Sequence, residues 1–314
     1  MMNILLNEYL KILDYENIPD FLFKYIECPS LKRLKKVGYF CGMDYASKDI
    51  YDFGTYLSRF DHSLTTALIT WKYSKNKIET ISALFHDVST PCFSHVIDYM
   101  NKDYLKQEST EEKTEEILKN DNYFIHCLEN DNILIEDIID FKKHSIIDLD
   151  RPMLCADRID GIILNSLFWT KEISISEVNE IIKSIKVYKN EFKLLELGFD
   201  NKKIVKLILD KNNIVDTYCH SKYDNYMMEL LAYITKLCIN NNLFSYNDLY
   251  YLTEEDIIFR ILSSNNYEIL NLWYLFQNIK KEQIKDIELP LLKKRVINPL
   301  LNGKRIRGKY EEIN

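Results

Sequence analysis

Apolar residues recur at helical spacing along much of the chain. Between Tyr56 and Tyr73 they lie three or four residues apart, at Phe60, Leu64, Ala67, Leu68 and Trp71. This spacing places them on one face, and it predicts a helix over residues 56–73. A second helix is predicted over residues 77–85, where the apolar face consists of Ile78, Ile81, Leu84 and Phe85. We expect it to stop near Thr90, because a residue before proline is disfavoured in the helical conformation.

The same pattern predicts further helices along the chain. They cover residues 108–118, 131–141, 152–169, 218–240 and 253–263. Pro152 suits the first turn of its helix. Between about residues 172 and 215, short apolar segments alternate with polar turns, and no repeat or proline-, glycine- or serine-rich linker divides the chain. The prediction is an all-α fold, a helical bundle with at most minor strands.

The composition agrees with a globular helical protein and indicates which partners and which cellular compartment to expect. The 314 residues are 46% hydrophobic, and seven glycines and six prolines are too few for a turn-rich β-sandwich. The formal charge of −7 disfavours general binding to nucleic acid. The seven cysteines form no CxxC pair, which indicates reduced thiols. No stretch approaches the roughly 18 apolar residues of a membrane helix, so we expect a cytoplasmic protein with no membrane partner.

Two histidine-containing segments and one acidic segment carry the candidate chemistry. His62 lies within the first predicted helix, and His86 and Asp87 close the second. Asp157 lies in the segment ADRID, on the helix predicted from Pro152. Two imidazoles and two carboxylates form a mixed set suited to manganese, iron, magnesium or zinc. A single histidine on a helix is more often structural than a ligand, so these residues alone carry little weight.

These segments resemble the HD superfamily of metal-dependent phosphohydrolases. RFDHSLTTA, ALFHDVSTPCFSHVIDY and CADRIDG are similar to its motifs, and within the superfamily the chain most resembles the deoxynucleoside-triphosphate triphosphohydrolase branch. PSLKRLKKVG, YLTEEDIIFRIL and RVINPLLNGKRIRG extend the similarity over most of the chain. The resemblance implies an HD-domain helical bundle over residues 1–170, with additional C-terminal helices over residues 171–314 packed on it.

The resemblance also implies that His62, His86, Asp87 and Asp157 hold a divalent metal ion. Asp150, in the segment DLDR, is a rival for the fourth position. We prefer Asp157, because ADRIDGIILNS aligns without a gap to the corresponding run of the family. Asp150 could simply cap the helix that follows it. Such a metal can bind a phosphate oxygen and activate water.

Three further residues are expected to act in catalysis. By the resemblance, Arg59 and His95 neutralise the charge that develops on phosphate, and Asp98 fits the same pattern. Thr90 stands where the triphosphohydrolases carry a catalytic histidine, and a threonine cannot serve as a general acid near neutral pH. We therefore expect His95 to donate the proton.

Several of the predicted substrate-binding residues differ from those at the matching positions of the triphosphohydrolase branch. They are Thr90, Gln107, Arg158, Gly161 and Asn165. Gln107 lies in what resembles a His-Glu segment, so a second phosphate-handling histidine is missing. Gly161 and Asn165 stand where the branch has the tyrosine and the aspartate that hold the nucleotide sugar. The resemblance thus implies a retained metal core with an altered substrate or, alternatively, a lapsed active site.

The expected protein is a metal-dependent phosphohydrolase that acts on a nucleotide or related phosphate ester, as a homo-oligomer by analogy with the family. One alternative is a nucleotide-binding regulator built on the same fold. Another is a dinuclear HD phosphodiesterase or oxygenase that uses His126 and His144. His220 is expected to be structural or to line the substrate site. The basic clusters at residues 32–36 and 304–309 are either solvated surface or contacts to an anion.

Overall fold

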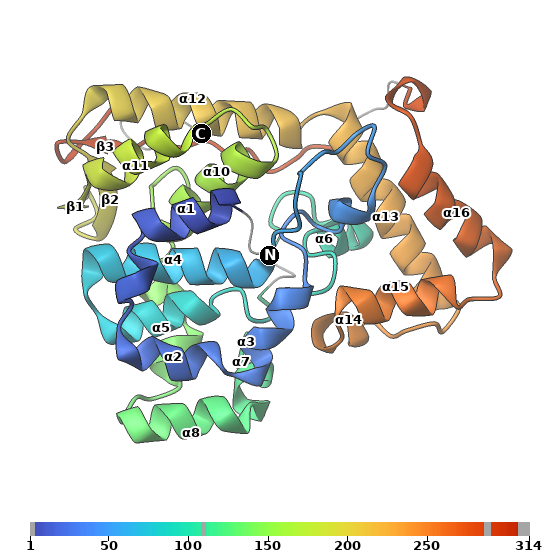
Figure 1. Ribbon diagram of the computed structural model, residues 1–314, viewed down its shortest axis with the longest axis horizontal. Helices are drawn as coiled ribbons and strands as arrows, with labels where there is room; N and C mark the ends of the chain where they lie inside the picture. The colour runs from blue at the N-terminus through green and yellow to red at the C-terminus, as the bar shows by residue number, and fades with distance from the viewer. Residues whose placement is uncertain (1–3, 108–110, 286–289, 307–314) are drawn as a thin grey trace.

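The computed structural model of the chain describes residues 4–107, 111–285 and 290–306. Helices predominate, and Figure 1 shows how they are arranged. In chain order the elements are α1 (Ile4–Ile12), α2 (Asp20–Ile26), α3 (Pro29–Arg33), α4 (Arg59–Ser74), α5 (Lys77–Phe85), α6 (Val96–Asn101), α7 (Thr114–Asn120), α8 (Asn122–Asp131), α9 (Glu136–Ile139), α10 (Ala156–Phe168), α11 (Ile175–Ser184), β1 (Ile185–Lys189), β2 (Leu195–Phe199), α12 (Lys202–Cys219), α13 (Lys222–Asn240), α14 (Asp248–Tyr251), α15 (Glu254–Leu262), α16 (Tyr267–Asn278), β3 (Leu300–Leu301) and β4 (Lys304–Arg305).

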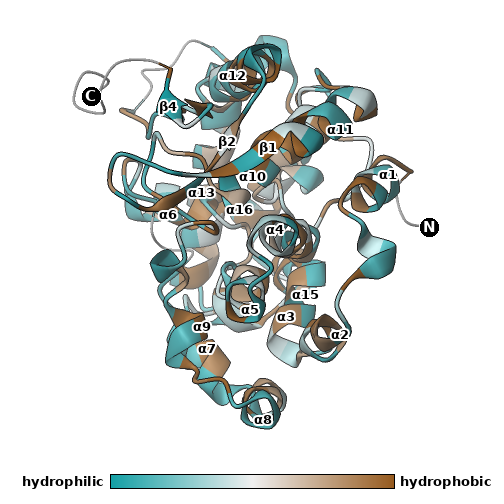
Figure 2. Cartoon of the chain, turned by 90° about the vertical axis from the view of Figure 1, so that its left-hand side faces the viewer, coloured by the Kyte–Doolittle hydropathy of each residue, from teal (hydrophilic) through white to brown (hydrophobic). Residues whose placement is uncertain are grey.

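Helix α4 is buried along most of its length. Its residues from Arg59 to Thr70 are buried with the single exception of Asp61, so it presents apolar or small side chains to neighbours on several sides. It packs against α5 and α10. Figure 2 shows these two helices on either side of α4, with α8 and α12 at opposite ends of the view. The helix that carries two candidate site residues is therefore held on both flanks.

The predicted helices over residues 56–73, 77–85 and 253–263 are present with small shifts at their ends. Helix α4 begins at Arg59 rather than Tyr56, because Ser58 and Asp61 form a capping box. Helix α5 has the predicted bounds, with the Asn76 side chain capping its first turn. It ends at Phe85, five residues before Thr90, so the proline is not what stops it.

The predicted bounds of other helices were wrong, and the local sequence at the helix ends explains the differences. The helix predicted over 131–141 is replaced by α8, which ends at Asp131, and by the single turn α9. Pro152 precedes α10 instead of lying in its first turn, and Cys155 is the N-cap. The helix predicted over 218–240 is split, because Ser221 caps a new helix, α13. Of the helix predicted over 108–118, residues 108–110 lie outside the described residues, and α7 begins at Thr114.

A small four-stranded sheet joins the end of the chain to its middle. The strand order is β1-β2-β3-β4, with β2 and β3 parallel and the other pairs antiparallel. Gly198 lies opposite Leu300, and the Arg305 guanidinium forms ion pairs with Glu191 and Glu196 at 2.8 and 2.6 Å. The prediction of a mostly helical protein is confirmed, and these four strands are the minor strands that the prediction allowed.

Before it enters the sheet, the chain crosses the molecule as an extended segment, residues 290–299, which we call the C-terminal strap. The amide of Lys293 donates to the carbonyl of Tyr104 at 3.1 Å. Further along, the amide of Asn298 donates to the carbonyl of Pro152 at 2.8 Å. The strap thus links the loop after α6 to the loop before α10. Across the described ranges, no helix has the length and apolar character needed to span a membrane.

Candidate metal centre

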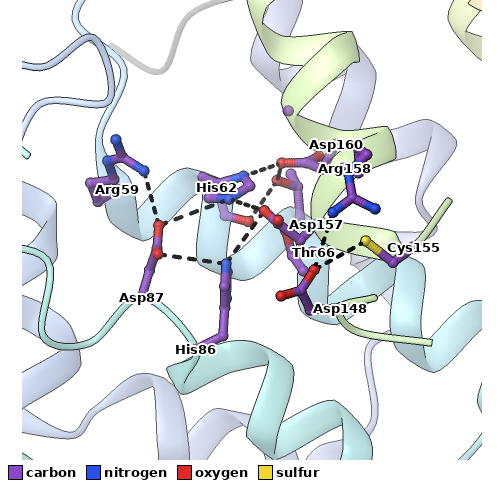
Figure 3. Close-up of polar contacts among 12 residues, drawn as sticks. Arg59, His62, Thr66, His86, Asp87, Asp148, Cys155, Asp157, Arg158 and Asp160 are labelled. Atoms are coloured by element: carbon purple, nitrogen blue, oxygen red, sulfur yellow. Dashed lines mark hydrogen bonds and ion pairs between the residues drawn. The ribbon is translucent and has the colours of Figure 1, made fainter. Parts of the chain in front are cut away.

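Three segments that are far apart in the sequence bring the four predicted metal ligands together (Figure 3). His62 lies in the first turn of α4, and His86 and Asp87 follow α5 directly. Asp157 lies in the first turn of α10. The two histidines are 3% and 5% exposed, whereas the Asp157 side chain is 35% exposed. The ligand set is therefore buried on the histidine side and open on the Asp157 side.

The donor atoms of these residues face one another. His62 Nε2 lies 2.9 Å from Asp157 Oδ1 and 3.9 Å from Asp87 Oδ2. His86 Nε2 lies 3.6 Å from Asp157 Oδ1 and 3.8 Å from Asp87 Oδ1. The donor atoms of His62, His86 and Asp87 all lie within 4.8 Å of one another, so this group could hold a metal ion.

His86 shows most directly that these residues fit a cation. Its Nδ1 donates to the carbonyl of Ala83 at 2.7 Å, which leaves Nε2 as an acceptor that points toward the carboxylates. Within the described residues Nε2 is buried and has no hydrogen-bond partner. A buried nitrogen without a partner costs about 1–3 kcal/mol, and a metal ion would satisfy it.

Asp160 orients His62 from the other side. Its Oδ2 accepts a hydrogen bond from His62 Nδ1 at 2.7 Å and another from the Thr65 hydroxyl at 2.8 Å. Its Oδ1 accepts from the Tyr9 hydroxyl at 2.6 Å. Carboxylates that hold the second nitrogen of a histidine are typical of metal sites. Sequence analysis did not assign this role to Asp160, although its position three residues after Asp157 places both on one face of α10.

Close packing of charge shifts the pKa values of these groups. Burial alone would lower the pKa of His62, but hydrogen bonds to Asp157 and Asp160 outweigh it and raise the pKa to about 10. Burial alone would raise the pKa of Asp87, but His86, Arg59 and His62 lower it to about 2. Without metal, the protons on His62 therefore hold the carboxylates in place.

Asp157 also belongs to a second group of donor atoms. Asp148, Cys155 and Asp157 have donor atoms within 4.8 Å of one another. Arg158 already contacts this group, because its Nη2 lies 3.4 Å from Asp148 Oδ1. Asp150 is exposed, and the N-cap of α10 is Cys155, so the expectation that Asp150 caps this helix was wrong.

A cavity of about 230 Å³ opens beside the candidate ligands. Its described lining includes an aromatic group made up of Tyr39, Phe40, Tyr51, Phe53, Tyr99 and Trp169. The Phe40 and Phe53 rings stack with their centroids 3.9 Å apart. A basic group of side chains lines the same cavity, namely Arg59, Arg151, Arg158, Lys293 and Arg295. The cavity thus offers an aromatic surface together with a concentration of positive charge.

Two of the three residues expected to act in catalysis line this cavity. Arg59 is buried, and its Nη1 lies 3.1 Å from Asp87 Oδ2 while its Nε donates to Ser94 Oγ at 3.1 Å. His95 Nδ1 lies 2.8 Å from Asp98 Oδ2. Asp98 is fully buried behind the histidine and is not among the lining residues. Asp98 therefore fixes the orientation of the His95 ring.

The predicted substrate-binding residues divide into two groups. Gln107, Arg158, Gly161 and Asn165 line the cavity. Thr90 is fully buried and does not line it, so the structure does not place this residue in the substrate site.

The histidines that would serve a dinuclear centre lie elsewhere. His126 is exposed on α8. His144 Nε2 lies 2.9 Å from the carbonyl oxygen of Asp137, and neither histidine belongs to a described group of metal-binding donors. His220, in contrast, lines the cavity, as one of its two expected roles required.

The two basic clusters are largely satisfied within the chain. Lys32 pairs with Glu27, and Lys36 pairs with Glu255 at 2.6 Å. At the other end, Arg305 binds the two glutamates of the sheet, and Arg307 and Lys309 lie outside the described residues. Nothing in these contacts directs either cluster toward the cavity.

No protein-family model matches this chain. The uncharacterized protein YdhJ of Bacillus subtilis (strain 168) is 22% identical to it over 231 residues. The match covers 69% of this chain and 64% of YdhJ, so the chain spans less than two thirds of that relative's length. The similarity carries no activity from one protein to the other.

Proposed function

We propose that this chain is a metal-dependent phosphohydrolase with the helical bundle of the HD superfamily, and that it acts on a nucleotide or a related phosphate ester. The observation that carries the proposal is the buried Nε2 of His86, which has no partner within the described residues and faces Asp87 and Asp157. A phosphohydrolase needs such a set of donors beside an open cavity, and the cavity lies next to it.

The ligand set defines what an ion would contribute. A divalent ion held by His62, His86, Asp87 and Asp157 would polarise a phosphoryl oxygen and lower the pKa of a bound water. The two negative charges of the carboxylates would offset the charge of the ion.

The protein's own residues supply the remaining roles. Asp87 and Ser94 anchor Arg59, so its guanidinium is held rigidly at the cavity wall, where it can neutralise charge on phosphate. When both ring nitrogens of His95 are protonated, Nδ1 donates a hydrogen bond to Asp98 and Nε2 can donate its proton to the leaving group. Such carboxylate–histidine pairs fix both the tautomer and the direction of proton transfer.

The first experiment measures the metal content of purified protein. We expect about one divalent ion per chain, and we expect its loss in His86→Ala and Asp87→Ala. Asp157→Ala should also lose the ion, whereas Asp150→Ala should keep it, because Asp150 is exposed and outside the donor group. Full metal occupancy in the His86 and Asp87 variants would refute the site. Loss in Asp150→Ala alone would show that the wrong aspartate was chosen.

The second experiment tests the activity. The metal-loaded protein is assayed for phosphate release from nucleotides and dinucleotides, with His86→Ala as the inactive control. Turnover that disappears in this variant supports the hydrolase. Tight nucleotide binding without turnover of any compound would favour a nucleotide-binding regulator instead.

A further inference from the structure

The turn between α5 and α6 holds two residues in an unusual backbone conformation. Phe93 and Ser94 have φ values of 64° and 47°, so both lie in the left-handed region although both carry side chains. This conformation is unfavourable for residues other than glycine, and it persists only where surrounding contacts enforce it. Ser94 anchors Arg59, and His95 follows directly in the chain. The contacts that enforce this turn therefore affect two groups of the proposed mechanism.

Glu254 provides one of these contacts from a distant part of the chain. It is the first residue of α15, and its Oε1 accepts a hydrogen bond from the Phe93 amide at 3.0 Å. Glu254 is fully buried, and it is not among the described residues that line the cavity. Burying a carboxylate costs free energy unless hydrogen bonds or opposite charges compensate it. Packing alone therefore does not account for a glutamate at this position.

The start of α15 is capped without the side chain of Glu254. The Thr253 hydroxyl accepts a hydrogen bond from the Asp256 amide at 3.3 Å, and the Asp256 carboxylate accepts one from the Thr253 amide at 3.0 Å. This reciprocal pair is the capping box of the helix. The carboxylate of Glu254 is thus left for its contact with the turn before α6.

Glu254 also lies against the segment that precedes α4. A Cβ built on Gly38 would lie 3.1 Å from Glu254 Oε2, so the missing side chain lets the carboxylate approach this backbone. Gly38 forms a bridge with Ser58, the N-cap of α4, and its carbonyl accepts from the Ser94 hydroxyl at 3.4 Å. Arg59 Nε donates to the same hydroxyl at 3.1 Å. Glu254 therefore contacts both segments that fix Arg59.

We propose that Glu254 is a positioning residue for Arg59 and His95. Its carboxylate holds the Phe93 amide, and the turn held in this way places the Ser94 hydroxyl against Arg59 and the His95 ring at the cavity. The catalytic roles of Arg59 and His95 rest on the proposed function, whereas the placement of their side chains does not. It follows that α15, one of the C-terminal helices, contributes to the arrangement of the catalytic groups in the first 170 residues.

NMR of the histidine rings in metal-free, full-length protein tests the placement. Glu254→Met keeps most of the side-chain volume and removes the acceptor, so the His95 ring signals, assigned by their absence in His95→Gln, should shift. Glu254→Gln keeps an acceptor oxygen and should give nearly wild-type signals. Glu255→Met is the matched control, because Glu255 is exposed in the same turn of α15. Unshifted His95 signals in Glu254→Met, or equal shifts in Glu255→Met, would overturn the proposal.

Urea unfolding shows whether each variant is folded under the conditions of the NMR measurement. If Glu254→Met does not fold, Glu254→Asp takes its place. The aspartate keeps the charge but is one methylene shorter, so it draws the acceptor away from the Phe93 amide. The same shift of the His95 signals is expected from it, and its absence would contradict the proposal equally.

Turnover of p-nitrophenyl phosphate with manganese tests the consequence for catalysis. Glu254→Met should lower kcat about 10- to 100-fold, because displacing a catalytic group by about 1 Å can cost that much. KM should change less, since Arg59 and His95 act on charge that develops in the transition state. Manganese content should stay at the wild-type level, because Glu254 is outside the donor groups of the described residues.

Glu254→Gln should retain most of the wild-type kcat, because it keeps the acceptor. A wild-type kcat in Glu254→Met, or an equal loss in Glu254→Gln, would overturn the positioning role. If the wild type itself releases no p-nitrophenol, the proposed hydrolase is refuted for this ester. The His95 signals then still decide whether Glu254 places the ring, since they require neither metal nor turnover.

Discussion

Asp160 illustrates how one side chain can govern a site without contacting the ligand. It is fully buried and accepts hydrogen bonds from His62, Thr65 and Tyr9. Asp160→Asn should lower manganese affinity about 10- to 100-fold, because the neutral amide holds the His62 ring less firmly. Tyr9→Phe, which removes one hydrogen bond and no charge, should have a smaller effect. Titration of the metal-free proteins with Mn²⁺ measures both, and equal affinities for Asp160→Asn and wild type would contradict this role.

A second pair of buried carboxylates gives a prediction about pH. Asp44 and Glu254 flank Gly38, and one oxygen of each is buried without a hydrogen-bond partner among the described residues. Burial and the charge of Glu254 raise the pKa of Asp44 from 3.8 to about 7. The folded protein therefore binds more protons than the unfolded chain between about pH 4 and 7, so this group makes stability fall as pH rises through that window.

Asp44→Asn should remove that fall. Its gain in stability over the wild type should be small near pH 4 and should grow until about pH 7, because only the wild type then carries a buried charge. Urea unfolding at pH 4, 6 and 8 measures the difference. Glu255→Gln serves as the control, since Glu255 is exposed and its pair with Lys36 is a surface ion pair. A gain that does not vary with pH would show that the charge of Asp44 is not the cause.

At the scale of elements, helix α4 depends on its capping box, which also sets the first turn that carries Arg59 and His62. Ser58→Ala should cost about 1 kcal/mol of stability and should weaken metal binding as well, since the first turn frays. Ser174→Ala removes the same capping box from α11, which contributes no candidate ligand. We expect a similar loss of stability from Ser174→Ala, measured by urea unfolding, with manganese affinity unchanged. If both variants bind manganese as the wild type does, the first turn of α4 is held by packing and not by its cap.

The helices that the sequence predicted well are those with one apolar face and local end signals. Helices α5 and α15 have such faces, and polar side chains at Asn76 and Thr253 cap them. The sequence pattern did not predict helix α8, because much of this helix is polar and exposed. Strands β3 and β4 have two residues each and pair across the local turn Asn302-Gly303, but the place of β3 in the sheet depends on Leu300 meeting Gly198 about a hundred residues earlier. No local pattern encodes such a contact.

The residues of the candidate site also differ in whether a local sequence signal predicts them. His62, His86 and Asp87 lie in segments whose sequences resemble motifs of a known family, so the sequence alone predicts them as metal ligands. Asp160 lay in the same segment as Asp157, but its hydrogen bond to His62 depends on the packing of α10 against α4. Arg295 had no local signal for a site, because the strap that carries it is neither helix nor strand and reaches the cavity only through tertiary contacts.

At the scale of the whole molecule, the cavity determines which substrates fit. Gly161 lines it, and among the described residues a Cβ added there would meet only the Tyr39 hydroxyl, at 3.7 Å, so the space beside α10 is open. The Asn165 amide is already engaged, because it donates to the Tyr39 hydroxyl at 3.1 Å and to the carbonyl of Gly161 at 2.7 Å. Neither residue offers the phenol or the carboxylate that the resembling branch uses to hold a sugar.

Ordinary deoxynucleoside triphosphates should therefore be poor substrates. By the resemblance to the triphosphohydrolases, Thr90 and Gln107 stand in place of two imidazoles, and of these two residues Gln107 lines the cavity. The loss of one positioned acid typically costs about 10²- to 10⁴-fold in rate. A substrate with a phosphoanhydride leaving group, or one that fills the space beside Gly161, should react faster. A side-by-side turnover assay with manganese decides this by comparing the four deoxynucleoside triphosphates with monophosphates, dinucleotides and cyclic dinucleotides. Efficient release of inorganic triphosphate from a deoxynucleoside triphosphate would mean that His95 alone suffices as the acid and that the open space at Gly161 does not select against ordinary nucleotides.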